Sequence, residues 1–94
     1  MEEKRLLDEA LEELHGAKHY AKCAMKWRDS DPTKAKKYYD MALDELRHAD
    51  TIYRMVEPRA GRTEMETSYM DEAREKYIEK CTKIKMMLEM YRGS

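Results

Sequence analysis

The chain has 94 residues, and 19 lysines and arginines balance 20 aspartates and glutamates to give a formal net charge of −1. This length allows one domain, and the interspersed charges argue against a nucleic-acid-binding protein. No apolar run approaches the roughly 20 residues that cross a bilayer, and the charged N-terminus does not resemble a signal peptide, so we expect a cytoplasmic protein with no membrane partner.

The first predicted helix covers about residues 3–28, where apolar side chains recur with helical period. They form one stripe: Leu7, Ala10, Leu11, Leu14, Ala17, Ala21 and Met25. Glu13 falls beside apolar residues on this helix, whereas its neighbour Glu12 points to the solvent side. A carboxylate on the apolar side of a helix requires a compensating partner.

The turn Asp29-Ser30-Asp31-Pro32 separates the first helix from a second, at about residues 32–56, with Asp31 or Ser30 as N-cap. The second stripe contains Ala35, Tyr38, Tyr39, Ala42, Leu46, Ala49, Tyr53 and Val56. Glu45 falls within this stripe and His48 at its edge. Because the turn is short, the two helices are predicted to form an antiparallel hairpin.

A second break at Glu57–Arg62 leads to a third helix at about residues 64–91, with Thr63 and Glu66 placed to form a capping box. Its stripe contains Tyr69, Met70, Ala73, Tyr77, Cys81, Ile84, Leu88 and Tyr91. No segment alternates with period two, so the predicted fold class is all-α, a single domain over residues 1–94. The third helix either completes a three-helix bundle or packs on another subunit.

The heptapeptide DELRHAD, residues 44–50, places Glu45 and His48 three residues apart on one helix. This spacing alone is weak evidence, because Glu12 and His15 form a second such pair on the solvent side. The position of Glu45 on the apolar side, with Glu13 on the paired helix, favours a shared cation over ordinary surface charges. We therefore predict a metal site at Glu13, Glu45 and His48.

Two carboxylates and one imidazole suit iron, or manganese, better than zinc. One chain offers half of the ligands of a dinuclear site, which in ferritin-like bundles takes one Glu from each of two helices and a Glu-x-x-His from each of two others. The third helix contains no histidine. We therefore expect a second copy to supply the other half, in a homodimer that forms a four-helix bundle.

The segments EELHGAKHYAKCA (residues 12–24) and DELRHAD resemble the ferritin-like superfamily, and the resemblance extends over roughly residues 8–56. The nearer likeness is to the encapsulated-ferritin type, in which one hairpin per chain builds a di-iron site across a dimer interface. Rubrerythrins are more distantly similar, with a Glu followed seven residues later by a Tyr, here Glu13 and Tyr20. This resemblance implies Glu13, Glu45 and His48 as iron ligands, with Tyr20 beside them.

The resemblance also implies a ferroxidase, which oxidises Fe(II) to Fe(III) with dioxygen for iron storage or detoxification. Such proteins form ring-shaped homo-oligomers of dimers inside a protein nanocompartment. The printed sequence differs from this family in two respects: it shows no extended C-terminal tail of the kind that directs such cargo to its shell, and its third helix is longer than expected.

Three further interpretations stay open. Glu12, His15 and His19 share one face of the first helix and form either a second candidate metal site or a solvated surface. The chain could also be a metal-free helical interaction module, in which Glu45 and His48 pair with basic residues across an interface. A rubrerythrin-like peroxide reductase is a third reading, although the sequence has no CxxC motif to hold an electron-donating iron centre.

Overall fold

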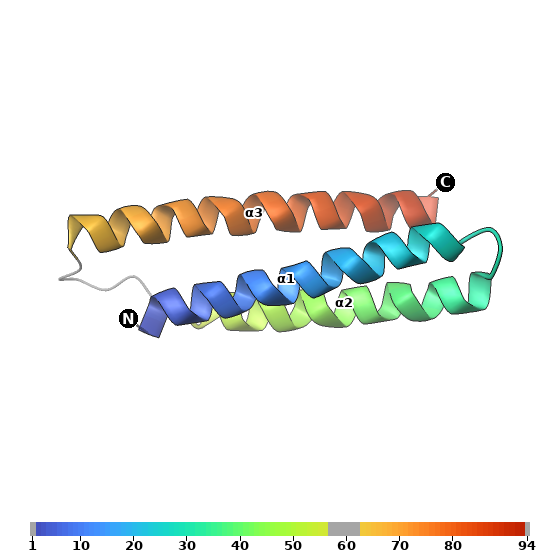
Figure 1. The fold of residues 1–94 in the computed structure, drawn as a ribbon, viewed down its shortest axis with the longest axis horizontal. Coiled ribbons are helices and arrows are strands. Elements are labelled where there is room, and N and C mark those ends of the chain that lie inside the picture. The colour runs from blue at the N-terminus through green and yellow to red at the C-terminus, as the bar shows by residue number, and fades with distance from the viewer. Residues whose placement is uncertain (1, 57–62, 94) are drawn as a thin grey trace.

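The computed structural model describes residues 2–56 and 63–93, which form three helices and no strand. The helices are α1 (Glu2–Trp27), α2 (Pro32–Arg54) and α3 (Glu64–Gly93), as Figure 1 shows. Every helix boundary lies within two residues of its predicted position. The all-α prediction is confirmed for this part of the chain, while the predicted break at residues 57–62 lies outside it.

The starts of α2 and α3 are fixed by the predicted caps. The backbone N–H of Lys34 donates to Asp31 Oδ1 at 3.1 Å, which makes Asp31 the N-cap of α2. At the start of α3, the N–H of Glu66 donates to Thr63 Oγ1 at 3.1 Å, and the N–H of Thr63 donates to Glu66 Oε1 at 3.2 Å. This reciprocal pair is a capping box, as predicted.

Helices α1 and α2 form an antiparallel hairpin with a seam of small side chains between them. Seven alanines are completely buried: Ala10, Ala17, Ala21, Ala24, Ala35, Ala42 and Ala49. The distance between packed helices depends on the side chains at their contact, so methyl groups allow α1 and α2 to approach closely. Polar side chains at the edge of this seam on the two helices are therefore brought within reach of each other.

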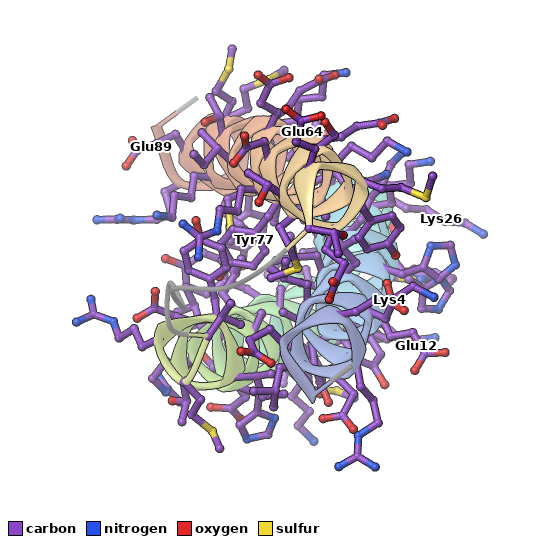
Figure 2. The ribbon with its side chains drawn as sticks, turned by 90° about the vertical axis from the view of Figure 1, so that its left-hand side faces the viewer. Lys4, Glu12, Lys26, Glu64, Tyr77 and Glu89 are labelled. Carbon is purple, nitrogen blue, oxygen red and sulfur yellow. The ribbon has the colours of Figure 1, made fainter. Side chains whose placement is uncertain are left out.

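Helix α3 runs alongside α1 in the same direction and covers one side of the hairpin (Figures 1 and 2). Leu14, Ile84 and Leu88 lie in the core that joins them. Helix α2 makes few contacts with α3, although Tyr53 stacks on Tyr77 with ring centroids 4.0 Å apart. The third helix thus packs on its own chain, and the opposite side of the hairpin has no helix over it among the described residues.

One residue of the predicted α3 stripe lies at the surface instead. The side chain of Tyr69 is 38% exposed, because its hydroxyl donates to Asp8 Oδ1 at 2.9 Å and its ring lies under the ammonium group of Lys4. Four other large apolar side chains of α3 are also exposed: Met65, Ile78, Met86 and Met90. None of the described helices is long and apolar enough to cross a membrane.

Candidate metal centre

Glu13 of α1 lies beside Glu45 and His48 of α2, and one ligand atom from each of the three falls within 4.8 Å of the others. His48 Nδ1 is 3.9 Å from Glu13 Oε2 and 3.8 Å from Glu45 Oε1. The structure therefore brings together the three residues that the sequence predicted as metal ligands. No other group of three such residues meets the same criterion in the part of the chain that the structure describes.

The arrangement follows from the hairpin. Glu45 and His48 are one helical turn apart and so lie side by side on α2. The alanine seam brings α1 close, and the antiparallel direction sets Glu13 opposite this pair. Gly16 completes the arrangement from α1, because a β-carbon at this position would be only 3.0 Å from Glu45 Oε2. The absence of a side chain at Gly16 leaves room for the Glu45 carboxylate.

The cluster lies at the edge of the apolar stripe rather than inside it, which differs from the sequence prediction. The side chains of Glu45 and Glu13 are 26% and 33% exposed, and that of His48 is 62% exposed. Helix α3 contributes no residue to the group. The three side chains are thus accessible from solvent, so an ion or a second protein chain can reach them without rearrangement of the hairpin.

The two carboxyl groups interact directly. The pKa of Glu45 is raised above its ordinary value, first by a hydrogen bond with the carboxyl group of Glu13, then by desolvation and by repulsion from the Glu13 charge. The nearby His48 acts in the opposite direction. Without a cation, the two carboxyl groups therefore tend to share a proton, and a divalent ion could replace it.

The predicted neighbour Tyr20 is half-buried on α1 and stacks on Tyr38 of α2, with ring centroids 6.2 Å apart. Among the described residues, no hydrogen bond joins its hydroxyl to Glu13 or Glu45. Its role beside the ligands stays a prediction.

The second predicted site, at Glu12, His15 and His19, is not assembled as a three-ligand group among the described residues. His19 Nε2 lies 3.8 Å from Cys23 Sγ, one turn further along α1. His15 instead lines a groove between α1 and α3. Metal binding at this second position also stays a prediction.

Gly16 is the residue of this region that the sequence analysis did not single out. A glycine inside a helix costs up to about 1 kcal/mol relative to alanine, so its presence within a strongly helical segment was the available signal.

Comparisons with protein-family models, curated proteins and solved structures find no match. The ferritin-like resemblance therefore depends on the motif residues alone.

Proposed function

We propose that this chain binds iron at Glu13, Glu45 and His48 and oxidises Fe(II) to Fe(III) with dioxygen, in a ferritin-like protein for iron storage or detoxification. The observation that carries the proposal is the convergence of these three side chains from two helices, with ligand atoms within 4.8 Å of one another. Two carboxylates and one imidazole form a ligand set suited to Fe(II), and also to Mn(II).

One chain supplies an incomplete site, and this supports a homodimer. A ferritin-like dinuclear centre requires a second Glu and a second Glu-x-x-His, which a two-fold related copy of the same hairpin offers. The side of the hairpin that carries the cluster has no helix of this chain over it among the described residues. In the proposed dimer, the two hairpins form a four-helix bundle and each α3 lies outside it.

In this dimer, Glu13, Glu45 and His48 of each chain would hold the two irons, with Glu45 shared between them. Two Fe(II) ions held close together give up one electron each, and dioxygen accepts both electrons with two protons to form hydrogen peroxide and two Fe(III). The chain contributes fixed positions for the two ions and negative charge that favours Fe(III) over Fe(II).

The test is metal content and Fe(II) oxidation of the purified protein. We expect about one iron per chain, and oxidation with dioxygen that is lost in both Glu13→Gln and Glu45→Gln. Glu75→Gln is the matched control, because Glu75 is an exposed glutamate of α3 outside the cluster. Iron content that is the same in all four proteins, or oxidation no faster than in buffer, would contradict the proposal.

A metal-free interaction module is the second candidate, and the position of His48 favours it. His48 lies within 4 Å of both Glu13 and Glu45, so a protonated imidazole could compensate the carboxylates without an ion. A protein that purifies as a dimer, binds no Fe(II) and keeps its dimer in Glu45→Gln would support this candidate. If iron is bound, oxidation by hydrogen peroxide instead of dioxygen would indicate a rubrerythrin-like peroxide reductase.

A further inference from the structure

A groove of about 450 Å³ runs between α1 and α3 and takes no part in the Glu13, Glu45 and His48 cluster. Its walls carry Lys18 and His15 from α1 and three lysines from α3. The residues that line it are Leu11, Leu14, His15, Lys18, Lys76, Glu79, Lys80, Lys83, Ile84 and Met87. Figure 2 shows that Lys4 and Lys26, near the two ends of α1 and outside the lining of the groove, project to one side of the molecule.

The groove is basic although the chain as a whole is not. Four lysines line it and only one acidic residue, Glu79, which pairs with Lys83 at 3.1 Å. Lys76 pairs with Glu72 at 3.6 Å. Lys18 and Lys80 have no ion-pair partner among the described residues. Acidic and basic residues are mixed along the sequence, but the helices place mostly lysines on the surface of this groove. The groove therefore carries an excess of positive charge, which attracts an acidic partner.

The floor of the groove is apolar. Leu14 and Ile84 are buried at its base, and Leu11 and Met87 are partly exposed above them. Methionine adapts its shape to different neighbours, which suits a surface that receives side chains of another protein. An apolar floor between rows of lysines is complementary to a helix with one apolar and one acidic side.

The spacing of the lysines indicates which kind of ligand fits the groove. Lys76, Lys80 and Lys83 follow one another by about one turn and extend over about 10 Å of α3. A single phosphate or carboxylate needs donors that converge on one point, whereas these ammonium groups are distributed in a row. Glutamates on one side of a helix repeat every 5–6 Å or so and match this row. Nucleic-acid phosphates also form a row, but they gain nothing from the apolar floor.

We propose that the groove between α1 and α3 binds an acidic amphipathic helix of a partner protein. Its apolar side chains would contact Leu11 and Met87, and its carboxylates would pair with Lys18 and Lys80. This inference is independent of the proposed iron chemistry, since the groove and the metal cluster share no residue.

The probe is a synthetic helical peptide of about 18 residues, rich in alanine and glutamate, with leucines on one side. We expect saturable binding by fluorescence anisotropy, with NMR shift changes at Leu11 and Met87. Lys80→Glu should weaken binding about tenfold, because it replaces an attraction by a repulsion. Lys37→Glu on α2 is the matched control, since Lys37 is also an exposed helical lysine without an ion-pair partner among the described residues, and it should leave binding unchanged.

Three results would overturn the inference. The first is no binding of the peptide. The second is equal binding of a peptide with the same composition whose leucines are distributed around the helix, which would leave only non-specific charge attraction. The third is tighter binding of a single-stranded oligonucleotide that is also sensitive to Lys80→Glu, which would assign the groove to nucleic acid. Glu45→Gln should bind the peptide normally, so a failure of the iron proposal does not affect this test.

Discussion

The carboxylate of Glu45 on α2 lies against the backbone of Gly16 on α1, so closely that a β-carbon on Gly16 would be 3.0 Å from Glu45 Oε2. A methyl group at Gly16 would crowd the Glu45 carboxylate in its position beside Glu13. The geometry of the Glu13, Glu45 and His48 cluster is therefore sensitive to a residue outside the cluster.

Gly16→Ala should raise the stability of the metal-free protein and lower its affinity for metal. We expect the metal-free protein to gain up to about 1 kcal/mol of helix stability, because alanine is the better helix former. Fe(II) or Mn(II) should bind about tenfold more weakly, since the new methyl group displaces Glu45 by a few tenths of an ångström from its position beside Glu13. Calorimetric titration measures the affinity and circular dichroism the melting temperature.

Gly93→Ala is the control for this variant, because nothing lies within 4 Å of a β-carbon built at Gly93. It should leave metal affinity unchanged. If Gly16→Ala binds metal as tightly as the parent protein, the Glu45 carboxylate does not need the space above Gly16.

Glu45→Gln should stabilise the metal-free protein, and more so as the pH rises. The raised pKa of Glu45 means that folding favours its protonated form, so the parent protein loses stability as the pH rises through this pKa. Glutamine has no charge to lose.

The measurement is the difference in melting temperature between Glu45→Gln and the parent in the presence of a chelator, from about pH 4 to about pH 7. We expect this difference to become more positive with pH. A difference that stays constant, or one that favours the parent at neutral pH, would show that the two carboxyl groups do not interact in solution. Glu75→Gln should show no such trend.

Met41→Glu should disrupt the proposed dimer. Met41 is 40% exposed and lies one turn before Glu45 and two turns before His48, on the side of the hairpin that the proposal places against a second copy. A charge there would be buried in the interface without a partner, so sedimentation should show a monomer with weakened iron binding. Met86→Glu changes an exposed methionine of α3 and should leave the dimer intact. Dimers in both variants would place the interface elsewhere.

Ala42→Leu should destabilise the fold by about 1–3 kcal/mol, because it inserts a larger side chain at a position that is completely buried. Ala42 is completely buried between α1 and α2. Urea denaturation measures the change in the free energy of unfolding. Lys37→Leu, at an exposed position of the same helix, should change it little. Equal stability of the two variants would mean that α1 and α2 are less closely packed than the structure shows.

The sequence was sufficient to predict the helices and the three clustered residues. Helical periodicity placed Glu13 and Glu45 on facing sides of a hairpin, and the short turn at Asp31 determined that the hairpin is antiparallel. These predictions depend on local geometry, in which each residue advances about 100° around its helix. The caps at Asp31 and Thr63 could be predicted for the same reason, because capping involves residues only two or three positions apart.

Features that depend on contacts between helices could not be predicted in this way. The apolar stripe of α3 was predicted, and Met70, Tyr77 and Ile84 of this stripe are buried, but the sequence did not reveal that the stripe packs on α1 of the same chain. The exposure of Tyr69 depends on Asp8, 61 positions away in the sequence. The basic groove likewise appears only when Lys18 and Lys80 are placed beside each other by the packing of α1 on α3.

Helix α1 contacts both other helices. The contacting residues are closer in sequence at the interface with α2 than at the interface with α3. The interface with α2 forms across a short turn, whereas the interface with α3 joins segments such as Asp8 and Tyr69. Closing the longer loop costs more chain entropy, so the hairpin should form first during folding and α3 should dock afterwards. Glu13, Glu45 and His48 all belong to the hairpin, whereas the groove for the proposed partner helix requires α3. The residues of the proposed iron site should therefore be assembled before the chain acquires the surface on which the proposed partner binds.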